Sequence, residues 1–255
     1  MRKRHLFVCG CPRSGTTALW KILTSHPEIV LGLERYHHLA FAVGGGGLTP
    51  ELFSKERFLD VRPGDTFYPS FSVFKHFDEH LQAVEERYDT ARWIGDKIPQ
   101  LSTVLDHVDS RFEDAHIVAI LRDPLAVAAS YQVRANDRQD MLWGVERNYA
   151  LAVDEWNLAT RRLLDFSRRQ DRRSGLTLVS YEDIFRDGAN VSALFAELGL
   201  DTPEAVRAAC SAVLEEAGRL RSLRGAVLTD EQSSLVTKAA DIEAADELLR
   251  QRLVV

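Results

Sequence analysis

Short apolar runs alternate with longer amphipathic segments along most of this chain. The apolar runs are typical of buried strands and lie at about residues 5–9, 28–31, 92–95, 115–121 and 176–179. Between them, apolar residues recur three and four positions apart, as on one face of a helix. Strands that alternate with helices favour a parallel sheet covered on both faces. The pattern therefore predicts a three-layer α/β/α fold with a central parallel sheet.

Proline, glycine and capping residues indicate where the predicted helices begin and end. The first helix opens at Gly15 to Thr17 and ends before Pro27, since proline cannot continue it. Asp123 and Pro124 are typical of an N-cap and a first helical turn. The stretch from Asp96 to Pro99 is expected to be a loop. Further helices are predicted at 76–88, 101–108 and 141–169, and a helical C-terminal region at 189–252 has caps at Thr202 and Thr229.

Residues 40–75 are the least regular part of the sequence. They hold four consecutive glycines, Gly44 to Gly47, and the aromatic-rich stretch from Phe67 to Phe77 begins in them. A mobile lid over a substrate and a loop without function explain this composition equally well. The aromatic residues fit either an apolar substrate pocket or ordinary core packing.

Composition argues against several classes of protein. With 255 residues, 45% of them apolar, and no repeat or shift in composition, the chain is expected to form one domain over 1–255. A formal net charge of −6 argues against general binding to nucleic acid. Three cysteines fit neither a zinc pattern nor a disulfide framework. No apolar run reaches transmembrane length, and the first is too short for a signal peptide, so we expect a cytoplasmic protein.

Residues 10–17 form a phosphate-binding pattern with one informative change. Gly10, Gly15 and Thr17 match the loop G-x-x-x-x-G-K-[ST], but Thr16 replaces its lysine. The backbone N–H groups and the helix N-terminus still favour an anion, whereas γ-phosphoryl transfer loses its usual cation. Arg13 is the cation within the loop. The pattern thus predicts a phosphate-like donor that needs no lysine here.

Further candidate residues follow strands at the same edge of the predicted sheet. Glu34 comes just after the second strand, and Arg122 leaves the end of the 115–121 strand, with Ser130 eight residues on. Ligand sites of open α/β sheets form at the carboxyl ends of their strands. Beside a phosphate loop, Arg122 and Ser130 are a candidate second phosphate site, although an arginine after a strand often forms a surface ion pair.

Taken together, these segments resemble the sulfotransferase family, whose donor is 3′-phosphoadenosine 5′-phosphosulfate (PAPS). The resemblance runs in the same order over roughly residues 5–200. It implies that Arg122 and Ser130 bind the 3′-phosphate and that Tyr181 lies near the adenine. The implied loop for the 5′-phosphosulfate consists of Pro12, Arg13, Ser14, Gly15, Thr16 and Thr17.

The segment around Glu34 is similar to that of protein-tyrosine sulfotransferases, which use a glutamate there as the catalytic base. Cytosolic sulfotransferases of small molecules use a histidine after the third strand, where this chain reads Asp96 to Gln100 without histidine. Lys97 matches a lysine that the tyrosine enzymes place near the bridging oxygen. The resemblance therefore implies Glu34, Lys97 and Arg13 as catalytic residues. The alternatives are a helix-start carboxylate for Glu34 and a solvated loop charge for Lys97.

The match departs from the cytosolic enzymes at two places. They carry lysine where Arg13 stands, and tryptophan where Ala18 follows the threonine pair. Their C-terminal Arg-Lys-Gly element, which closes on the 3′-phosphate, is absent, and Arg221 to Gly225 is the nearest candidate. Arg224 is the contact predicted from this stretch, although a basic helix end has the same composition.

Several histidines have ordinary explanations beside functional ones. His37 and His38 are expected to be helix residues at the edge of the cleft, with His38 as an alternative base. His76 and His80 are spaced like metal ligands on a helix, but no third ligand is evident. The resemblance implies no metal.

Two other functions stay open at this point. A P-loop kinase of a small metabolite shares the fold, but it lacks the lysine and has Asp96 and Asp123 as poor Mg²⁺ candidates. A non-catalytic nucleotide-binding module is the other alternative. For a sulfotransferase, we expect a bacterial enzyme that acts on a hydroxyl of a metabolite, carbohydrate or lipid precursor. The sequence does not indicate an oligomeric state.

Overall fold

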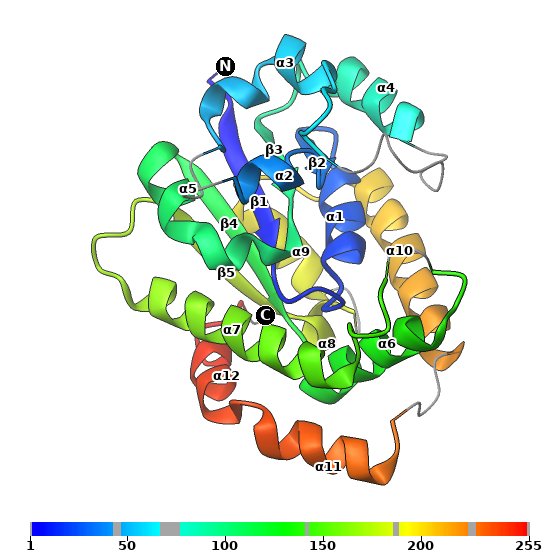
Figure 1. Cartoon of the computed structure of the whole chain (residues 1–255). Helices are drawn as coiled ribbons and strands as arrows, with labels where there is room; N and C mark the ends of the chain where they lie inside the picture. Colours follow the sequence, from blue (N-terminus) through cyan, green and yellow to red (C-terminus); the bar gives the residue numbers. More distant parts are fainter. Residues whose placement is uncertain are drawn as a thin grey trace.

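The central sheet has five parallel strands in the order β2-β3-β1-β4-β5 (Figure 1). The computed structural model describes residues 2–42, 47–66, 77–140, 143–185, 189–223 and 228–253. The strands are β1 (Arg4–Cys9), β2 (Ile29–Leu33), β3 (Trp93–Lys97), β4 (Ala115–Leu121) and β5 (Gly175–Ser180). The first strand lies in the middle, between β3 and β4. The predicted α/β fold with a central parallel sheet is confirmed.

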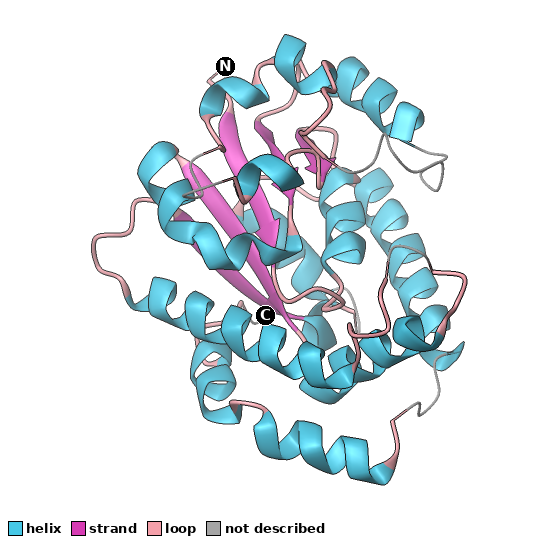
Figure 2. Cartoon of the chain, viewed as in Figure 1, coloured by secondary structure: helices cyan, strands magenta, loops and turns pink. Residues whose placement is uncertain are grey.

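Side chains alternate between the two faces of β1 and enter two separate cores. Leu6 and Val8 belong to one cluster of buried apolar residues, and Phe7 and Cys9 belong to the other. Helices cover both clusters, which gives the three layers seen in Figure 2. The first cluster is covered by α1 (Thr16–Thr24), α8 (Tyr181–Ile184), α9 (Ala189–Glu197) and α10 (Glu204–Leu223). The second is covered by α5 (Leu105–Arg111), α6 (Pro124–Asn136), α7 (Tyr149–Arg168), α11 (Asp230–Ala239) and α12 (Ile242–Leu249).

The third strand is longer than the sequence pattern predicted. It continues through Asp96 to Lys97, so the predicted loop from Asp96 is wrong for these two residues. Lys97 pairs with Leu33 of β2 and Val8 of β1, and this pairing extends the ladder past the apolar run. A 3₁₀ helix, η4 (Pro99–Val104), follows, and α5 begins at Leu105 rather than at residue 101.

The long amphipathic helix also begins later than expected. It starts at Tyr149 rather than at residue 141, because Asn148 caps it by accepting a hydrogen bond from the Ala150 N–H at 3.0 Å. Before it, Trp143 lies edge-on against Tyr131, with 4.8 Å between ring centroids. Two shorter helices are α2 (His37–Ala40) and α4 (Phe77–Arg87). The predicted cap of α11 at Thr229 is confirmed, and it forms a capping box with Gln232.

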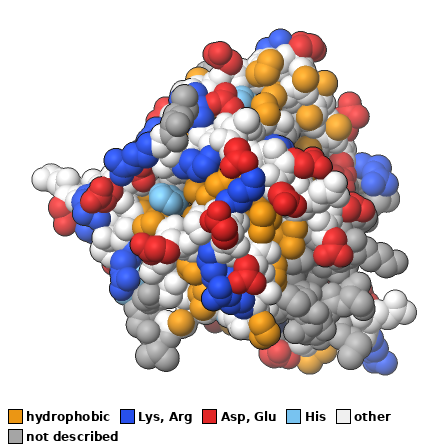
Figure 3. Space-filling model, turned by 90° about the horizontal axis from the view of Figure 1, so that it is seen from above, with side chains coloured by type: hydrophobic (Ala, Val, Ile, Leu, Met, Phe, Trp, Pro, Cys, Tyr) orange, Lys and Arg blue, Asp and Glu red, His pale blue; other side chains and the backbone are white. Residues whose placement is uncertain are grey.

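Charged side chains are dispersed over the described part of one face of the molecule (Figure 3). On the described part of the face shown in Figure 3, acidic and basic side chains are interspersed rather than gathered by sign. Among the described helices, none combines the length and the apolar character that a bilayer-crossing segment requires.

Residues 47–66 contain regular helical turns and buried side chains, whereas an irregular stretch was expected there. They form the 3₁₀ helix η2 (Pro50–Phe53) and α3 (Lys55–Leu59), and Phe53 and Phe58 are buried. The prediction of an irregular segment is therefore wrong for this part. Most of the glycine run and the aromatic residues 67–76 lie outside the described residues, as does His76.

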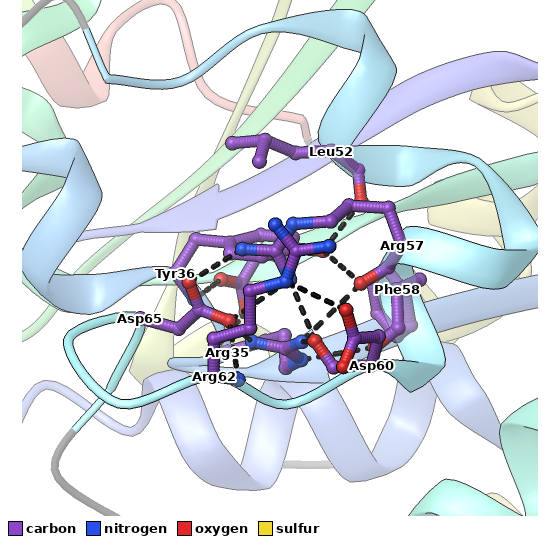
Figure 4. A network of polar contacts seen from close by, with 9 residues as sticks. Arg35, Tyr36, Leu52, Arg57, Phe58, Asp60, Arg62 and Asp65 are labelled. Carbon is purple, nitrogen blue, oxygen red and sulfur yellow. Dashed lines mark hydrogen bonds and ion pairs between the residues drawn. The ribbon is translucent and has the colours of Figure 1, made fainter.

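A buried polar network holds this segment against the end of β2 (Figure 4). The Arg35 side chain is 1% exposed and donates to Asp65 Oδ2 at 2.7 Å and to the Phe58 and Asp60 carbonyls at 3.0 and 2.9 Å. Arg57 donates to both oxygens of the same Asp65. Burial raises the pKa of Asp65, but the hydrogen bonds from Arg57 and Arg35 outweigh it and hold that pKa at about 2.

Asp65→Asn is expected to lower the free energy of unfolding at pH 7 by about 2 kcal/mol, because two guanidinium groups lose their carboxylate. The folded-state pKa lies below the unfolded value. The contribution is therefore complete above about pH 4 and disappears as the pH falls through about 2. Chemical denaturation at pH 7 and pH 3 checks this. Asp60→Asn, at a half-exposed carboxylate paired with Arg62, should change stability by a few tenths of a kcal/mol at either pH. Equal effects of the two substitutions at pH 7 would contradict the analysis.

Candidate active site

A sharply turned loop leaves β1 at the carboxyl edge of the sheet. Its backbone is fixed by a hydrogen bond from the Gly10 N–H to the Pro99 carbonyl at 2.9 Å. Gly10 has φ 152°, and a Cβ there would lie 2.4 Å from the Ile120 carbonyl oxygen. Arg13 and Gly15 also have positive φ, 69° and 94°. The loop therefore requires a glycine at position 10, where the chain passes close to β4, and it turns through a left-handed conformation at Arg13.

The inside of this loop is suited to an anion. Ser14 is 1% exposed, and within the described structure its Oγ has no hydrogen-bond partner. A buried hydroxyl without a partner is costly unless a ligand completes it. Helix α1 begins at Thr16 with Gly15 as its N-cap, so its first N–H groups and the positive end of its dipole face the same loop. These residues fit the 5′-phosphate end of the implied donor.

The second candidate phosphate site lies against the first. Arg122 donates from Nη1 to the Arg13 carbonyl at 3.1 Å, and Arg13 donates from Nε to Ser130 Oγ at 3.1 Å. The Arg122 carbonyl in turn accepts a hydrogen bond from Trp156 Nε1 at 2.9 Å. The structure thus brings together Arg13, Arg122 and Ser130, which are up to 117 residues apart in sequence. Trp156 was not expected from the sequence, because it lies on a helix far along the chain.

Tyr181 joins the two parts of this site. Its ring lies 4.1 Å from the Arg122 guanidinium carbon and 4.4 Å from the Phe185 ring. A Cβ on Gly15 would lie 2.6 Å from the same tyrosine ring, so the absence of a side chain at Gly15 lets the loop contact it. The ring thus supports the Arg122 guanidinium by a cation–π contact. The expected contact of Tyr181 with an adenine stays a prediction, and Arg224 lies outside the described residues.

An ion pair occupies the ends of the two neighbouring strands. Lys97 Nζ lies 2.6 Å from Glu34 Oε1, and the Glu34 N–H donates to the Lys97 carbonyl at 2.8 Å. The Lys97 side chain is 1% exposed and that of Glu34 is 16% exposed. Lys97 is therefore a buried strand residue, and the solvated loop charge considered for it is wrong. Glu34 keeps partial access to solvent.

His37 lies on the other side of the same carboxylate. Its Nδ1 is 3.6 Å from Glu34 Oε2. Burial lowers the pKa of His37, and the neighbouring Glu34 opposes this shift. His37 and His38 are residues of the short helix α2, as expected.

Asp96 has a role that the sequence did not indicate. It is fully buried, and its two oxygens accept the N–H groups of Arg35 at 3.1 Å and Tyr36 at 2.8 Å. Burial raises the pKa of Asp96 to about 7, although these hydrogen bonds oppose the shift. The other acidic residue considered for Mg²⁺, Asp123, caps α6 by accepting from the Ala126 N–H at 2.8 Å. Within the described ranges, no group of three or more His, Cys, Asp or Glu residues could hold a metal ion.

The fold and the loop at its edge define an α/β protein with a P-loop-like turn beside an ion pair. The profile of the Sulfotransferase family matches residues 5–204, most of the chain. The chain belongs to this family. The expectation drawn from the sequence motifs is therefore confirmed at the level of the family.

Solved structures of low sequence identity share this fold. The sulfotransferase from Alicyclobacillus acidocaldarius has a TM-score of 0.58 at 18% identity, with 99% of this chain and 98% of that chain covered. Sulfotransferase STF1 from Mycobacterium tuberculosis H37Rv has a TM-score of 0.53 at 17% identity, with 94% and 77% covered.

One curated relative matches over part of its length. The nodulation protein NoeE of Sinorhizobium fredii (strain NBRC 101917 / NGR234) is 28% identical over 132 residues. The match covers 49% of this chain and 30% of NoeE, so this chain aligns with less than a third of that protein.

Gly15→Ala tests the contact between the loop and Tyr181. The new Cβ would displace the tyrosine ring and hence the Arg122 guanidinium, so we expect about tenfold weaker binding of adenosine 3′,5′-bisphosphate, the loss of roughly one good contact. Gly64→Ala is the matched control, since Gly64 has φ 91° but no atom within 4 Å of the added Cβ. Isothermal titration calorimetry measures both. If the two variants bind the bisphosphate equally well, the contact does not matter for the site.

Proposed function

We propose that this chain transfers a sulfuryl group from PAPS to an acceptor hydroxyl, with Glu34 as the general base. Membership of the sulfotransferase family supports the transfer reaction. The observation that carries the finer proposal is the pair of Glu34 and Lys97, 2.6 Å apart, at the strand ends beside the anion loop. Lys97 pairs in the sheet with Val8, two residues before Gly10 of the loop, so an anion in the loop would lie close to the ion pair.

The donor is held by fixed cations and backbone donors. In this proposal the loop from Pro12 to Thr17 takes the 5′-phosphosulfate, with the Ser14 hydroxyl and the first N–H groups of α1 as hydrogen-bond donors. Arg122 and Ser130 take the 3′-phosphate, and Tyr181 supports the Arg122 guanidinium. Arg13 lies between the two phosphate sites through its hydrogen bonds with Ser130 and Arg122. When bound, PAPS supplies an activated sulfuryl group with the bisphosphate as leaving group.

The two residues of the ion pair have different roles in the proposed transfer. Glu34 accepts the proton of the acceptor hydroxyl as that oxygen attacks sulfur. Lys97 is almost fully buried, and its ammonium group stabilises the negative charge that grows on the bridging oxygen. Because Lys97 is paired with Glu34 before the reaction, its orientation is fixed without a rearrangement. The His37 ring contacts the other oxygen of Glu34 and limits the orientations of that carboxylate.

The kinase alternative is weakened by the positions of its acidic residues. Both oxygens of Asp96 and one of Asp123 are used by backbone N–H groups, so neither is placed as a ready Mg²⁺ ligand. A non-catalytic nucleotide-binding module would not require a buried lysine against a carboxylate beside the loop. The acceptor (a metabolite, carbohydrate or lipid precursor), a bacterial cytoplasmic location and a single domain over 1–255 stay predictions.

Donor recognition is tested by thermal shift with adenosine 3′,5′-bisphosphate and with ATP–Mg²⁺. The bisphosphate should raise the melting temperature by mass action, and ATP–Mg²⁺ should raise it far less. Arg122→Ala should weaken the bisphosphate by about 1–3 kcal/mol but adenosine 5′-phosphate much less, since the lost contact is to the 3′-phosphate.

Arg4→Ala is the matched control for this arginine. Arg4 also stacks at 4.1 Å on an aromatic ring, that of Trp93, but at the amino edge of the sheet, so bisphosphate binding should be unchanged. Stabilisation by ATP–Mg²⁺ and not by the bisphosphate would refute the proposed donor. Equal losses of affinity for both nucleotides in Arg122→Ala would show that Arg122 does not bind the 3′-phosphate.

Glu34→Gln should reduce single-turnover transfer by about 10²-fold or more, the scale of a positioned base, and leave bisphosphate affinity nearly intact. The assay uses labelled PAPS with an acceptor found by screening alcohols, phenols and carbohydrates. Glu28→Gln is the control, because Glu28 precedes β2 at its opposite end and pairs with Arg92 at 3.4 Å. An unchanged rate in Glu34→Gln would show that another group accepts the proton.

A further inference from the structure

Glu34 is held in a backbone conformation that a glutamate rarely adopts. Its φ is 56°, in the left-handed region, which is unfavourable for a residue with a side chain. Such a conformation persists where the surroundings impose it. The contacts of residues 34–36 therefore indicate what places the Glu34 carboxylate on Lys97.

The backbone of this segment closes around the Asp96 carboxylate. The consecutive N–H groups of Arg35 and Tyr36 donate to its two oxygens at 3.1 and 2.8 Å, while the Glu34 N–H donates to the Lys97 carbonyl at 2.8 Å. Successive N–H groups beside a left-handed residue form a concavity that binds an anion. Here the anion is a side chain of the neighbouring strand. The left-handed turn at Glu34 directs the N–H groups of residues 35 and 36 toward that carboxylate.

Gly32 provides the space for this arrangement. It pairs with Asp96 in the sheet, and a Cβ on it would lie 2.7 Å from Asp96 Oδ1 and 2.5 Å from the Arg35 Cβ. The chain can therefore turn back over Asp96 because residue 32 carries no side chain.

The side chains of the same two residues are held from the opposite direction. Arg35 is paired with Asp65, and the Tyr36 hydroxyl donates to the Leu52 carbonyl (Figure 4). Segment 34–36 is thus fixed at its backbone by β3 and at its side chains by residues 52–65. With both sets of contacts in place, the remaining freedom of Glu34 lies in its own side chain, which meets Lys97.

We propose that Asp96 is a positioning residue for the general base: its carboxylate binds the backbone of residues 35 and 36 and thereby holds Glu34 on Lys97. This inference rests on the proposed function for its catalytic consequence, but the placement itself can be tested without any transfer reaction. Asp96 acts through Glu34 and touches neither donor nor acceptor in this proposal.

A second buried aspartate of the same chain provides a matched control. Asp109 is 3% exposed, and its Oδ1 accepts the consecutive N–H groups of Arg173 and Ser174 at 2.9 and 2.7 Å. These groups precede β5, so they lie at the amino edge of the sheet, opposite the ion pair. Asp109→Asn therefore removes the same kind of contact without reaching Glu34.

The experiment compares Asp96→Asn, Asp109→Asn and Glu34→Gln by competitive acetylation of lysines with acetic anhydride, read by mass spectrometry. Asparagine keeps one acceptor oxygen but turns an NH₂ group toward a backbone N–H, so residues 34–36 should shift. Lys97 should then be acetylated about tenfold faster, because its amino group loses the Glu34 carboxylate that lies 2.6 Å away and holds it in place. The rate should approach that in Glu34→Gln, whereas Asp109→Asn should keep the wild-type rate.

The outcomes separate placement from folding and from catalysis. Acetylation of Lys97 at the wild-type rate in Asp96→Asn overturns the proposal, and so does an equal rise in Asp109→Asn. If Asp96→Asn does not fold, Asp65→Asn loosens the Arg35 side of the same segment and must raise Lys97 acetylation, or the proposal fails.

The catalytic consequence is measured separately. With a working acceptor, Asp96→Asn should lower the single-turnover rate by about tenfold or more with bisphosphate affinity unchanged. A raised Lys97 acetylation rate without transfer activity in the wild type would contradict the proposed function while leaving the placement by Asp96 intact.

Discussion

The buried ion pair between Lys97 and Glu34 is the interaction on which the candidate site depends. A lysine that is 1% exposed requires a partner, because an unpaired charge in the protein interior is strongly destabilising. The partner comes from the end of the adjacent strand, and the sheet holds the two strand ends in register from Ile29 to Leu33. The pairing thus couples the reactivity of the site to the stability of the β2–β3 edge.

The proposed anion site, in contrast, gathers positive groups in one place. Arg13 and Arg122 lie together with the N-terminus of α1 at the carboxyl end of the central strands. An aromatic ring, a serine hydroxyl and a backbone carbonyl are among the contacts that orient the two guanidinium groups. A doubly anionic ligand would complete these contacts. Glu34 directly follows β2, and Asp96 lies on β3.

Much of the fold could be predicted because the spacing of apolar residues and the positions of proline, glycine and capping residues are local properties of the sequence. The five strands, the helix after the phosphate loop and the caps at Asp123 and Thr229 were all expected from the sequence. Errors arose where tertiary contacts changed a boundary. Asp96 and Lys97 are strand residues because their neighbours in β1 and β2 extend the ladder. Polar residues after an apolar run do not by themselves indicate that a strand continues. Likewise, residues 50–59 became helical against the Arg35 network, which joins segments about 30 residues apart.

The sequence by itself determined the type of site: a glycine loop without the usual lysine, an arginine and serine eight apart, and a glutamate after the second strand. Each of these motifs lies within a short stretch of the sequence, so its chemistry can be recognised without knowledge of the fold. The tertiary structure decided which side chains meet. It paired Glu34 with Lys97, stacked Arg122 on Tyr181 and enclosed Asp96 in the turn after β2. Each of these contacts joins residues about 60 positions apart, and such contacts follow from strand order and close packing rather than from local pattern.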